Sequence, residues 1–373
     1  YLIYYLRPLI SILELKCQYL KNNECRYTVF FAQLKYRRIW SRNRGGVGMK
    51  VRLGLGLGAW AFDEFDSKNL YDFIDKCDDL GVDSLWISER IINDIPNRIV
   101  LDPIITLEAL AGKSRIMKFG TNALNLPARH PIVLAKELAT LDFLSRGRLL
   151  LVVGLGSDES RDYMASGGFK KERGARTDEC IEIMKLLWTQ NNVSFHGQYY
   201  SFDDVTIVPK PIQDPTPPVW IGGRSKAALK RTARLGDGWL PAGITPDECA
   251  DGIVEIQNLA SSDYDRAIPE DHFGVALSCF VSEDGAEIDK SILANVRRRH
   301  DASLDSYTAI GTPEEIIKTI DSYQKVGVTK FVLQPLAKPG DWLKQVEQIA
   351  KHVIKPLQTP FSKEEVFERS GVV

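Results

Sequence analysis

The chain has 373 residues, of which 44% are hydrophobic and 26% are charged, a composition that is ordinary for a globular protein with a large core. Its formal net charge is −1, with Lys and Arg interspersed among Asp and Glu, so it offers no basic stripe for a nucleic-acid backbone and no polybasic patch for a lipid surface. We therefore expect neither nucleic acid nor a membrane as a partner.

The cysteines are scattered along the chain, without a CxxC pair and without a histidine nearby at ligand spacing. This distribution argues against a disulfide framework and against a zinc site, so no metal is expected. A reducing, cytoplasmic compartment fits best. The cysteines are Cys17, Cys25, Cys77, Cys180, Cys249 and Cys279.

The N-terminal segment mixes helical and strand-like apolar spacing and has no turn residues that would organise it. Arg7 and Glu14 interrupt its apolar run before the roughly 20 residues that a membrane-spanning helix needs. A secretory signal fits poorly, because no basic region precedes the apolar stretch. Met49 stands directly before a strand pattern, so we interpret the segment as an extension that is disordered or not native. The predicted parts are the extension at 1–48, a barrel domain at 49–358 and a C-terminal tail at 359–373.

From Met49 onward, strand and helix patterns alternate. The first strand is predicted at 50–58 and the first helix at 67–81, with Ser67 as its N-cap and Gly81 at its end. Eight strands with intervening helices predict an α/β fold of the TIM (β/α)8 barrel class. An open doubly wound sheet is the alternative, although it normally has fewer strands. The other predicted strands are 83–88, 118–124, 148–154, 218–223, 238–241, 272–282 and 330–334, and the other helices are 102–114, 131–145, 225–236, 246–260, 286–300 and 313–327.

An insertion is predicted at 191–216, between the fourth and fifth barrel units. Its core, VSFHGQYYSF, resembles a short hairpin that turns at His196 and Gly197. Insertions on this face commonly build substrate pockets, but the aromatic side chains of the hairpin can equally pack it onto the barrel. These aromatic residues are Phe195, Tyr199, Tyr200 and Phe202.

Two apolar strand patterns, at 149–153 and at 219–221, end in glycines. Buried strands do so when their carboxyl ends open toward a ligand. The second pattern continues as IGGRSK, residues 221–226. Its glycines permit close backbone approach, the following helix presents free N–H groups and a positive dipole end, and Arg224, Ser225 and Lys226 supply further donors. The segment therefore predicts an anion site, the alternative being a tight turn with basic residues in solvent.

Several motifs in the same order resemble the luciferase-like monooxygenase family from about residue 50 to residue 355. The family implies a TIM-like barrel that binds FMN or the deazaflavin F420 at the carboxyl ends of its strands, and it covers several chemistries. The motifs are GVDSLWISER, PARHP, ELATLDFLSRGRLLLVVGLG, ERGARTDECIEIMKLLW, FHGQYYSF, PKPIQDPTPPVWIGG, ARLGDGWLP and IGTPEEIIKTIDSYQKVGVTKFVL.

The resemblance also implies roles for single residues. Asn122 and Asn125 take positions that contact the flavin, and the Asn122–Ala123 link is where some relatives have a non-prolyl cis peptide. Ser157 replaces the acid that certain sugar-phosphate-oxidising relatives use as a proton donor, which disfavours that activity. Space for the flavin ring is predicted at Gly154, Gly156 and Ser157, and binding of the cofactor phosphate at Gly222, Gly223, Ser225 and Lys226, assisted by Arg224.

One motif departs from the family. Deazaflavin-dependent relatives typically carry an Asp-His pair where this sequence has Glu89 and Arg90. Glu89 can hydrogen-bond a flavin edge or a ribityl hydroxyl, whereas Arg90 stays protonated and cannot replace a histidine as a general base. Arg90 can instead stabilise a reduced flavin or an oxyanion. These two residues are the predicted catalytic candidates, and a structural ion pair at the rim is the alternative.

The resulting hypothesis is a flavin-dependent monooxygenase that uses reduced FMN and O2 on a small organic substrate. It implies a separate flavin reductase as a partner, and a homo-oligomer is expected. The first alternative is an F420-dependent oxidoreductase that transfers hydride to or from such a substrate. A non-catalytic flavin-binding protein is the alternative from another class, and a flavin-independent barrel enzyme acting on a phosphorylated metabolite is a further one.

Overall fold

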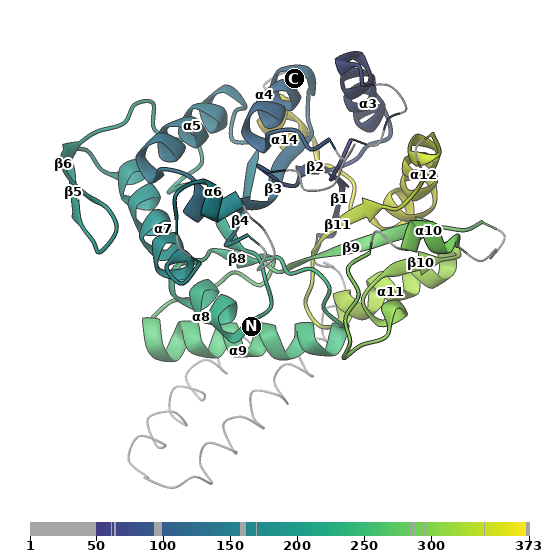
Figure 1. Cartoon of the computed structure of the whole chain (residues 1–373). Helices are drawn as coiled ribbons and strands as arrows, with labels where there is room; N and C mark the ends of the chain where they lie inside the picture. Colours follow the sequence, from purple (N-terminus) through teal and green to yellow (C-terminus); the bar gives the residue numbers. More distant parts are fainter. Residues whose placement is uncertain are drawn as a thin grey trace, which may run out of the picture. The chain divides into compact units, whose positions relative to one another are not determined.

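The computed structural model describes residues 50–370, apart from 61, 63–64, 93–98, 157–161, 169, 284, 286–287, 294–295 and 339. The predicted N-terminal extension therefore lies outside the described residues. Residues 50–373 form one compact unit. Within its described part, Figure 1 shows helices arranged around the outside of a set of parallel strands.

The strands build a curled sheet in which every registered pair is parallel. Two isolated parallel bridges, Trp239 to Phe273 and Ala242 to Ala276, bring one end of the sheet back to β9. The order is β10-β9-β11-β1-β2-β3-β4-β7-β8. The strands are β1 (Arg52–Leu57), β2 (Ser84–Ile87), β3 (Lys118–Asn125), β4 (Leu149–Gly154), β7 (Val219–Ile221), β8 (Gly238–Trp239), β9 (Gly274–Val281), β10 (Ala309–Gly311) and β11 (Lys330–Pro335).

The helices cover the outer face of this sheet (Figure 1). They are α3 (Ser67–Asp79), α4 (Pro103–Lys113), α5 (Pro131–Leu144), α6 (Asp162–Ala165), α7 (Arg173–Thr189), α8 (Lys226–Leu235), α9 (Pro246–Tyr264), α10 (Lys290–Leu293), α11 (Pro313–Lys325), α12 (Trp342–Ile349), α13 (Lys355–Leu357) and α14 (Lys363–Ser370). The short 3-10 helices η1 (Leu126–Ala128) and η2 (Leu304–Ser306) and the π-helical turn η3 (Ala350–Ile354) complete the described elements.

Successive strand residues are buried on opposite faces of the sheet. In β2, Leu85 and Ile87 join the large core under the helices, whereas Trp86 between them joins a separate cluster with Val152 and Val332. Because side chains alternate along a strand, this second cluster lies on the inner face of the curl. Burial on both faces explains why the strands read as near-continuous apolar runs.

Two sequence predictions need correction. The N-cap of α3 is Asp66 rather than Ser67, because the Asp66 carboxylate accepts the N–H of Lys68 at 2.9 Å. The helix predicted at 286–300 is wrong: in the described part of that range only α10 is helical. The N–H of Arg299 bonds to the hydroxyl of Tyr307 at 3.1 Å instead of to a helical carbonyl.

The predicted hairpin is present, with β5 (Val193–His196) antiparallel to β6 (Ser201–Val205). Residues 197–200 form its turn, and the Glu179 carboxylate on α7 accepts backbone N–H groups from this turn, including those of Gln198 and Tyr200. Three of the aromatic residues pack against the main core, and Tyr199 lies 4.6 Å from the Arg176 guanidinium. The contacts thus favour packing of the hairpin over pocket formation. The three residues are Phe195, Tyr200 and Phe202.

The predicted C-terminal tail contains α14, which joins the rest of the unit through ion pairs. Arg369 of α14 contacts the buried carboxylate of Asp83 at 3.0 Å, and Glu365 contacts Arg52 at 2.7 Å. Asp83 precedes β2 and Arg52 begins β1, so α14 closes the end of the sheet at which the strands start.

No helix in the described part of the chain has the length and apolar character needed to cross a membrane. The four cysteines that the structure describes are unpaired and buried. Burial raises their pKa values, to about 12 for Cys249, so these thiols are protonated near neutral pH. They are Cys77, Cys180, Cys249 and Cys279.

Candidate active site

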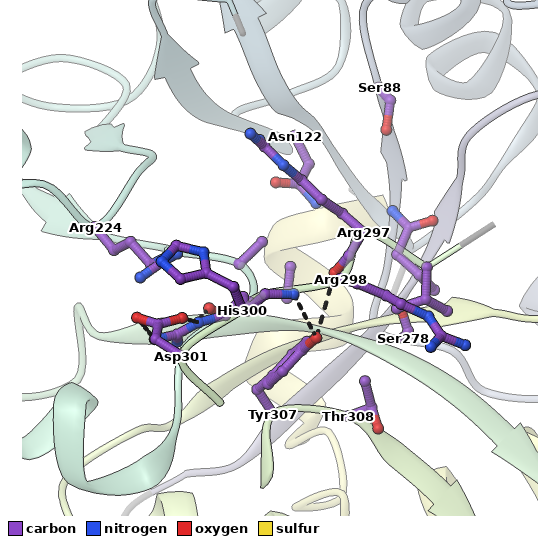
Figure 2. Close-up of a pocket in the computed structure, with 16 residues that line it drawn as sticks. Ser88, Asn122, Arg224, Ser278, Arg297, Arg298, His300, Asp301, Tyr307 and Thr308 are labelled. Carbon is purple, nitrogen blue, oxygen red and sulfur yellow. Dashed lines mark hydrogen bonds and ion pairs between the residues drawn. The ribbon is translucent and has the colours of Figure 1, made fainter. Parts of the chain in front are cut away.

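A cavity of about 530 Å³ opens at the carboxyl ends of the strands. Its wall includes Ser88 directly after β2, Asn122 in β3, Ser278 in β9 and Gln334 in β11 (Figure 2). Arg224, which follows β7, also lines it. Because ligands of parallel α/β folds bind at this end of the strands, the cavity is the candidate active site.

Where β3, β4 and β7 end, the residues that lie close together are an alanine and two glycines. A Cβ atom built on Gly154 would lie 3.3 Å from the Ala123 Cβ, and one built on Gly222 would lie 3.5 Å from the same atom. The Gly222 N–H also donates to the Val153 carbonyl at 2.8 Å. The peptide between Asn122 and Ala123, whose state the sequence left open, is cis. The three strand ends therefore form a half-buried patch of small residues, Ala123, Gly154 and Gly222, which we call the small-residue floor; it is not part of the described wall of the cavity.

The N-terminus of α8 follows this floor directly. Gly223 has φ +86°, a conformation that favours glycine, and its carbonyl accepts the indole N–H of Trp239 at 2.8 Å. Ser225 is the N-cap: its Oγ accepts the N–H of Ala228 at 3.3 Å, which leaves the hydroxyl proton to donate elsewhere. Arg224 and Lys226 are exposed beside it. This set of donors fits a phosphate group.

Asn125, at the end of β3, is buried, yet neither its amide oxygen nor its amide nitrogen has a hydrogen-bond partner in the described structure. Gly156 covers it with φ +74°, and a Cβ atom on Gly156 would lie 2.9 Å from the Asn125 Nδ2. A buried amide without partners is costly, so this pair marks a place where a polar ligand atom would be stabilising. Ser157, also predicted for the flavin ring, lies outside the described residues.

Glu89 is held by other residues of the protein. Its side chain is 1% exposed and accepts the backbone N–H of Asn125 and the Arg129 Nε at 3.0 Å. Burial raises the pKa of Glu89, and Arg129 opposes that rise. Glu89 and the half-buried Arg90 are both absent from the described wall of the cavity. The Glu89 carboxylate is thus bound to the end of β3 and to Arg129, and its predicted contact with a flavin stays a prediction.

The sequence interpretation missed a basic segment in the cavity wall. Arg297, Arg298, Arg299 and His300 all line the cavity, together with Tyr307 (Figure 2). The run of three arginines and a histidine at 297–300 is a visible signal for an anion site. The helix predicted at 286–300 hides it, because a helix would spread these side chains around its surface. An irregular backbone, rather than a helix, turns them toward the cavity.

Apart from Arg90 and Ser157, the predicted site residues fall into three groups, of which the first belongs to the described wall of the cavity. Asn122 and Arg224 share the cavity wall. Gly154 and Gly222 meet at the floor, and Gly156 covers Asn125, whose backbone N–H contacts Glu89. The phosphate-binding candidates Gly223, Ser225 and Lys226 follow the floor in sequence.

A family model described as luciferase-like monooxygenase matches residues 46–305 of the chain, which is well over half of its length. The chain belongs to the luciferase-like monooxygenase family. The resemblance in the sequence motifs is thereby confirmed, and the small-residue floor and the start of α8 lie within the matched region of this family member.

Relatives in this family differ in cofactor. The chain is 26% identical over 307 residues to an F420-dependent glucose-6-phosphate dehydrogenase of Amycolatopsis mediterranei, covering 72% of this chain and 89% of that protein. It is 25% identical over 310 residues to the oxygenase component of a flavin-dependent trigonelline monooxygenase of Acinetobacter baylyi, covering 72% of this chain and 84% of that protein. Luciferase-like relatives of both cofactor types are therefore similar to it.

A solved structure supports the fold. Monooxygenase RslO1 from Streptomyces bottropensis aligns with a TM-score of 0.69 at 22% identity, covering 82% of this chain and 99% of that one. The curled parallel sheet surrounded by helices is thus the fold of this luciferase-like protein.

Proposed function

We propose that this protein is a flavin-dependent monooxygenase that uses reduced FMN and O2 on a small organic substrate. The observation that carries the proposal is the small-residue floor lying directly before the donors of the α8 N-terminus. A flat ring system joined to a phosphate needs both features side by side. Family membership and the similarity to a trigonelline monooxygenase agree with it.

The residues present fit an FMN molecule. Gly222, Gly223, Ser225 and Lys226 would hold its phosphate with help from Arg224, and Asn122, Asn125, Gly154, Gly156 and Ser157 would surround its ring. When bound, reduced FMN supplies the electrons that activate dioxygen for transfer to a substrate. The partners that follow are a separate flavin reductase and a small organic substrate.

In this proposal, the side chains of the protein position the cofactor and the substrate, and none of them acts as a strong base. Arg129 holds the Glu89 carboxylate, which in turn fixes the Asn125 N–H at the end of β3. Arg90 remains a candidate for stabilising negative charge, because a guanidinium keeps its proton. A monooxygenase of this kind needs no base of unusual strength, and this agrees with the lack of a histidine beside Glu89.

The second candidate is F420-dependent hydride transfer to or from a small organic substrate, favoured by the similarity to an F420-dependent dehydrogenase. The same floor and phosphate donors would hold the deazaflavin. A nearby acid or base is then required for the accompanying proton, and His300 in the cavity wall is a candidate. A non-catalytic flavin-binding protein is the third candidate.

The proposed architecture is a closed (β/α)8 barrel. The bridges between β8 and β9 join the two sides of the curl, and β10 pairs outside this ring with β9. In that barrel, the β5–β6 hairpin is an insertion between the fourth and fifth units. The domain limits 1–48, 49–358 and 359–373, a cytoplasmic location and a homo-oligomer stay predictions.

Anaerobic titration of the whole chain with oxidised FMN, reduced FMN and F420 tests the proposal, followed by admission of oxygen while absorbance is recorded. We expect reduced FMN to bind and its reoxidation rate to change in the complex. F420 binding without an oxygen reaction would favour hydride transfer. Binding with neither oxygen consumption nor hydride transfer would leave the non-catalytic protein, and no binding of any cofactor would contradict all three candidates.

A further inference from the structure

The cavity carries a surplus of positive charge. Arg224, Arg297, Arg298 and Arg299 line it, whereas Asp301 is the one carboxylate among its described lining residues. Asp301 and the neighbouring Glu248 both pair with Arg299, at 2.8 Å and 2.6 Å. Arg224 lies close enough to Glu248 to help lower the pKa of that carboxyl, whereas Arg297 and Arg298 have no ion pair among the described residues. A cavity with unneutralised cations favours an anionic ligand.

Arg299 anchors the basic segment. Its guanidinium contacts both carboxylates and also donates to the Gly243 carbonyl at 2.9 Å. The hydrogen bond from Arg299 lowers the pKa of Glu248 to about 2, so this pair stays charged across the whole neutral range. Arg299 is thus engaged within the protein, and its role is to fix the segment.

The backbone on either side of Arg298 is fixed by Tyr307. The Tyr307 hydroxyl accepts the N–H of Arg299 at 3.1 Å and donates to the carbonyl of Arg297 at 3.4 Å. Val296, just before the segment, is buried in a small apolar cluster with Leu336. A guanidinium carried on a backbone that is already ordered loses less entropy when it binds a ligand.

Arg297 and Arg298 are exposed and extend from this anchored backbone to different sides of the cavity (Figure 2). In that view, Arg297 extends toward the side of Asn122 and Arg298 toward the side of Ser278. They come from the connection between β9 and β10, whereas the phosphate donors come from the start of α8. The cavity therefore has a second cationic group besides the one that suits the cofactor phosphate.

We propose that the substrate of this protein carries an acid group, a carboxylate or a phosphate, and that Arg297 and Arg298 hold it. This inference rests on the proposed function, since it specifies the substrate of the same site. Guanidinium forks match the geometry of carboxylate and phosphate oxygens and give charge-assisted hydrogen bonds. The acid group would lie at the basic segment, and the remainder of the substrate would extend into the cavity toward Asn122.

The test compares ligands that differ in charge but hardly in size. Phenylacetate, phenylacetamide and inorganic phosphate are titrated into the whole chain by calorimetry, with and without saturating FMN. We expect both anions to bind and phenylacetate to bind at least about tenfold more tightly than phenylacetamide. In the double variant Arg297→Gln, Arg298→Gln that preference should disappear.

Arg115→Gln is the matched control, because Arg115 is also exposed but lies before β3, at the opposite end of the strands. It should keep the full preference for phenylacetate. Equal binding of phenylacetate and phenylacetamide, binding of neither anion, or an unchanged preference in the double variant would overturn the proposal. A further result would also overturn it. If the double variant lost affinity for FMN or F420 but kept the preference for phenylacetate, the two arginines would bind an acidic part of the cofactor rather than the substrate.

The two proposals fail separately. If no flavin or deazaflavin binds the natural chain but the anion preference persists and depends on Arg297 and Arg298, the anion site stands and the flavin function is wrong. If cofactor binding is normal but the anion preference is absent, the flavin function stands and the acidic substrate is wrong.

Discussion

At the scale of single residues, the glycines within β1 and the glycine that follows β7 have different structural roles. A Cβ atom on Gly54 would lie 2.5 Å from the indole nitrogen of Trp86, and one on Gly56 would overlap the side chain of Gln334. These two glycines therefore make room on the inner face of the sheet, and the GLGLG pattern of β1 is a packing feature rather than a phosphate loop. Gly222 instead lies in the small-residue floor, beside Ala123.

The floor makes a direct prediction for Gly222. Replacing it with Val adds a branched side chain to the floor, since a Cβ atom there already lies 3.3 Å from the Val153 carbonyl oxygen and 3.5 Å from the Ala123 Cβ. We expect the affinity for reduced FMN to fall at least about tenfold, which corresponds to about 1.4 kcal/mol, as measured by absorbance titration. Thermal unfolding followed by circular dichroism checks that the variant is folded.

Gly112→Ala is the control for this change. A Cβ atom on Gly112, which lies in α4, would have no atom within 4 Å. Its FMN affinity should equal that of the natural chain. If the Gly222→Val variant is folded and its affinity for reduced FMN is unchanged, the small-residue floor does not bind the flavin.

At the scale of elements, the segment between β9 and β10 shows how local preference yields to tertiary contacts. The sequence there favours a helix over 286–300, yet residues 297–300 are irregular. The Tyr307 hydroxyl accepts the backbone N–H of Arg299, and the Glu248 carboxylate of α9 accepts a hydrogen bond from the Arg299 guanidinium. These contacts join residues from other elements, so the local pattern could not reveal them.

The start of α3 offers an element-scale prediction. The Asp66 carboxylate accepts the Lys68 N–H, so Asp66→Ala removes the N-cap hydrogen bond. We expect the free energy of unfolding to fall by about 1 kcal/mol, measured by urea denaturation. Ser67→Ala is the matched control, because Ser67 is the first helical residue, where Ala is well tolerated. A larger effect of Ser67→Ala than of Asp66→Ala would restore Ser67 as the cap.

At the scale of the whole molecule, one end of the curled sheet carries the candidate site and the other end carries contacts that stabilise the fold. The carboxyl ends of the strands carry the cavity, and their amino ends carry a buried ion cluster around Asp83. Asp83 contacts Lys330 at 2.6 Å and Arg369 at 3.0 Å, which joins β2, β11 and α14. Stability and ligand binding can therefore be perturbed separately.

Asp83→Asn tests this separation. Burial alone raises the pKa of Asp83, but Lys330 and Arg369 outweigh it and hold the pKa below its usual value. Removing one partner of such a buried cluster costs about 3–5 kcal/mol, so the unfolding free energy at neutral pH should fall by that order. FMN affinity should be unchanged at temperatures where the variant is folded.

The pH dependence of the same variant has a definite sign. Because the folded-state pKa of Asp83 is lowered, its contribution to stability is present above the unfolded value of about 3.9 and is lost as the pH falls below it. The natural chain and Asp83→Asn should therefore converge in stability on acidification, as measured by denaturation at a series of pH values. Asp72→Asn, at the exposed Lys68–Asp72 pair, should shift stability little at any pH. Parallel curves for the natural chain and Asp83→Asn would contradict this account.

By itself, the sequence determined the alternation of strands and helices and the family. Most elements lie within a few residues of their predicted bounds, because apolar periodicity, caps and glycines act over short distances. The anion-binding motif at 221–226 could be predicted for the same reason, since the strand end, the glycines and the helix start are contiguous.

Only the tertiary structure decided which side chains face the cavity. The environment of Glu89 depends on Arg129, 40 residues away, and the place of Arg297 and Arg298 depends on Tyr307 and Glu248. Such contacts join distant parts of the chain and leave no periodic trace in the sequence. Arg129 and the Asn125 N–H bind the Glu89 carboxylate, and an irregular backbone brings the basic side chains to the cavity wall.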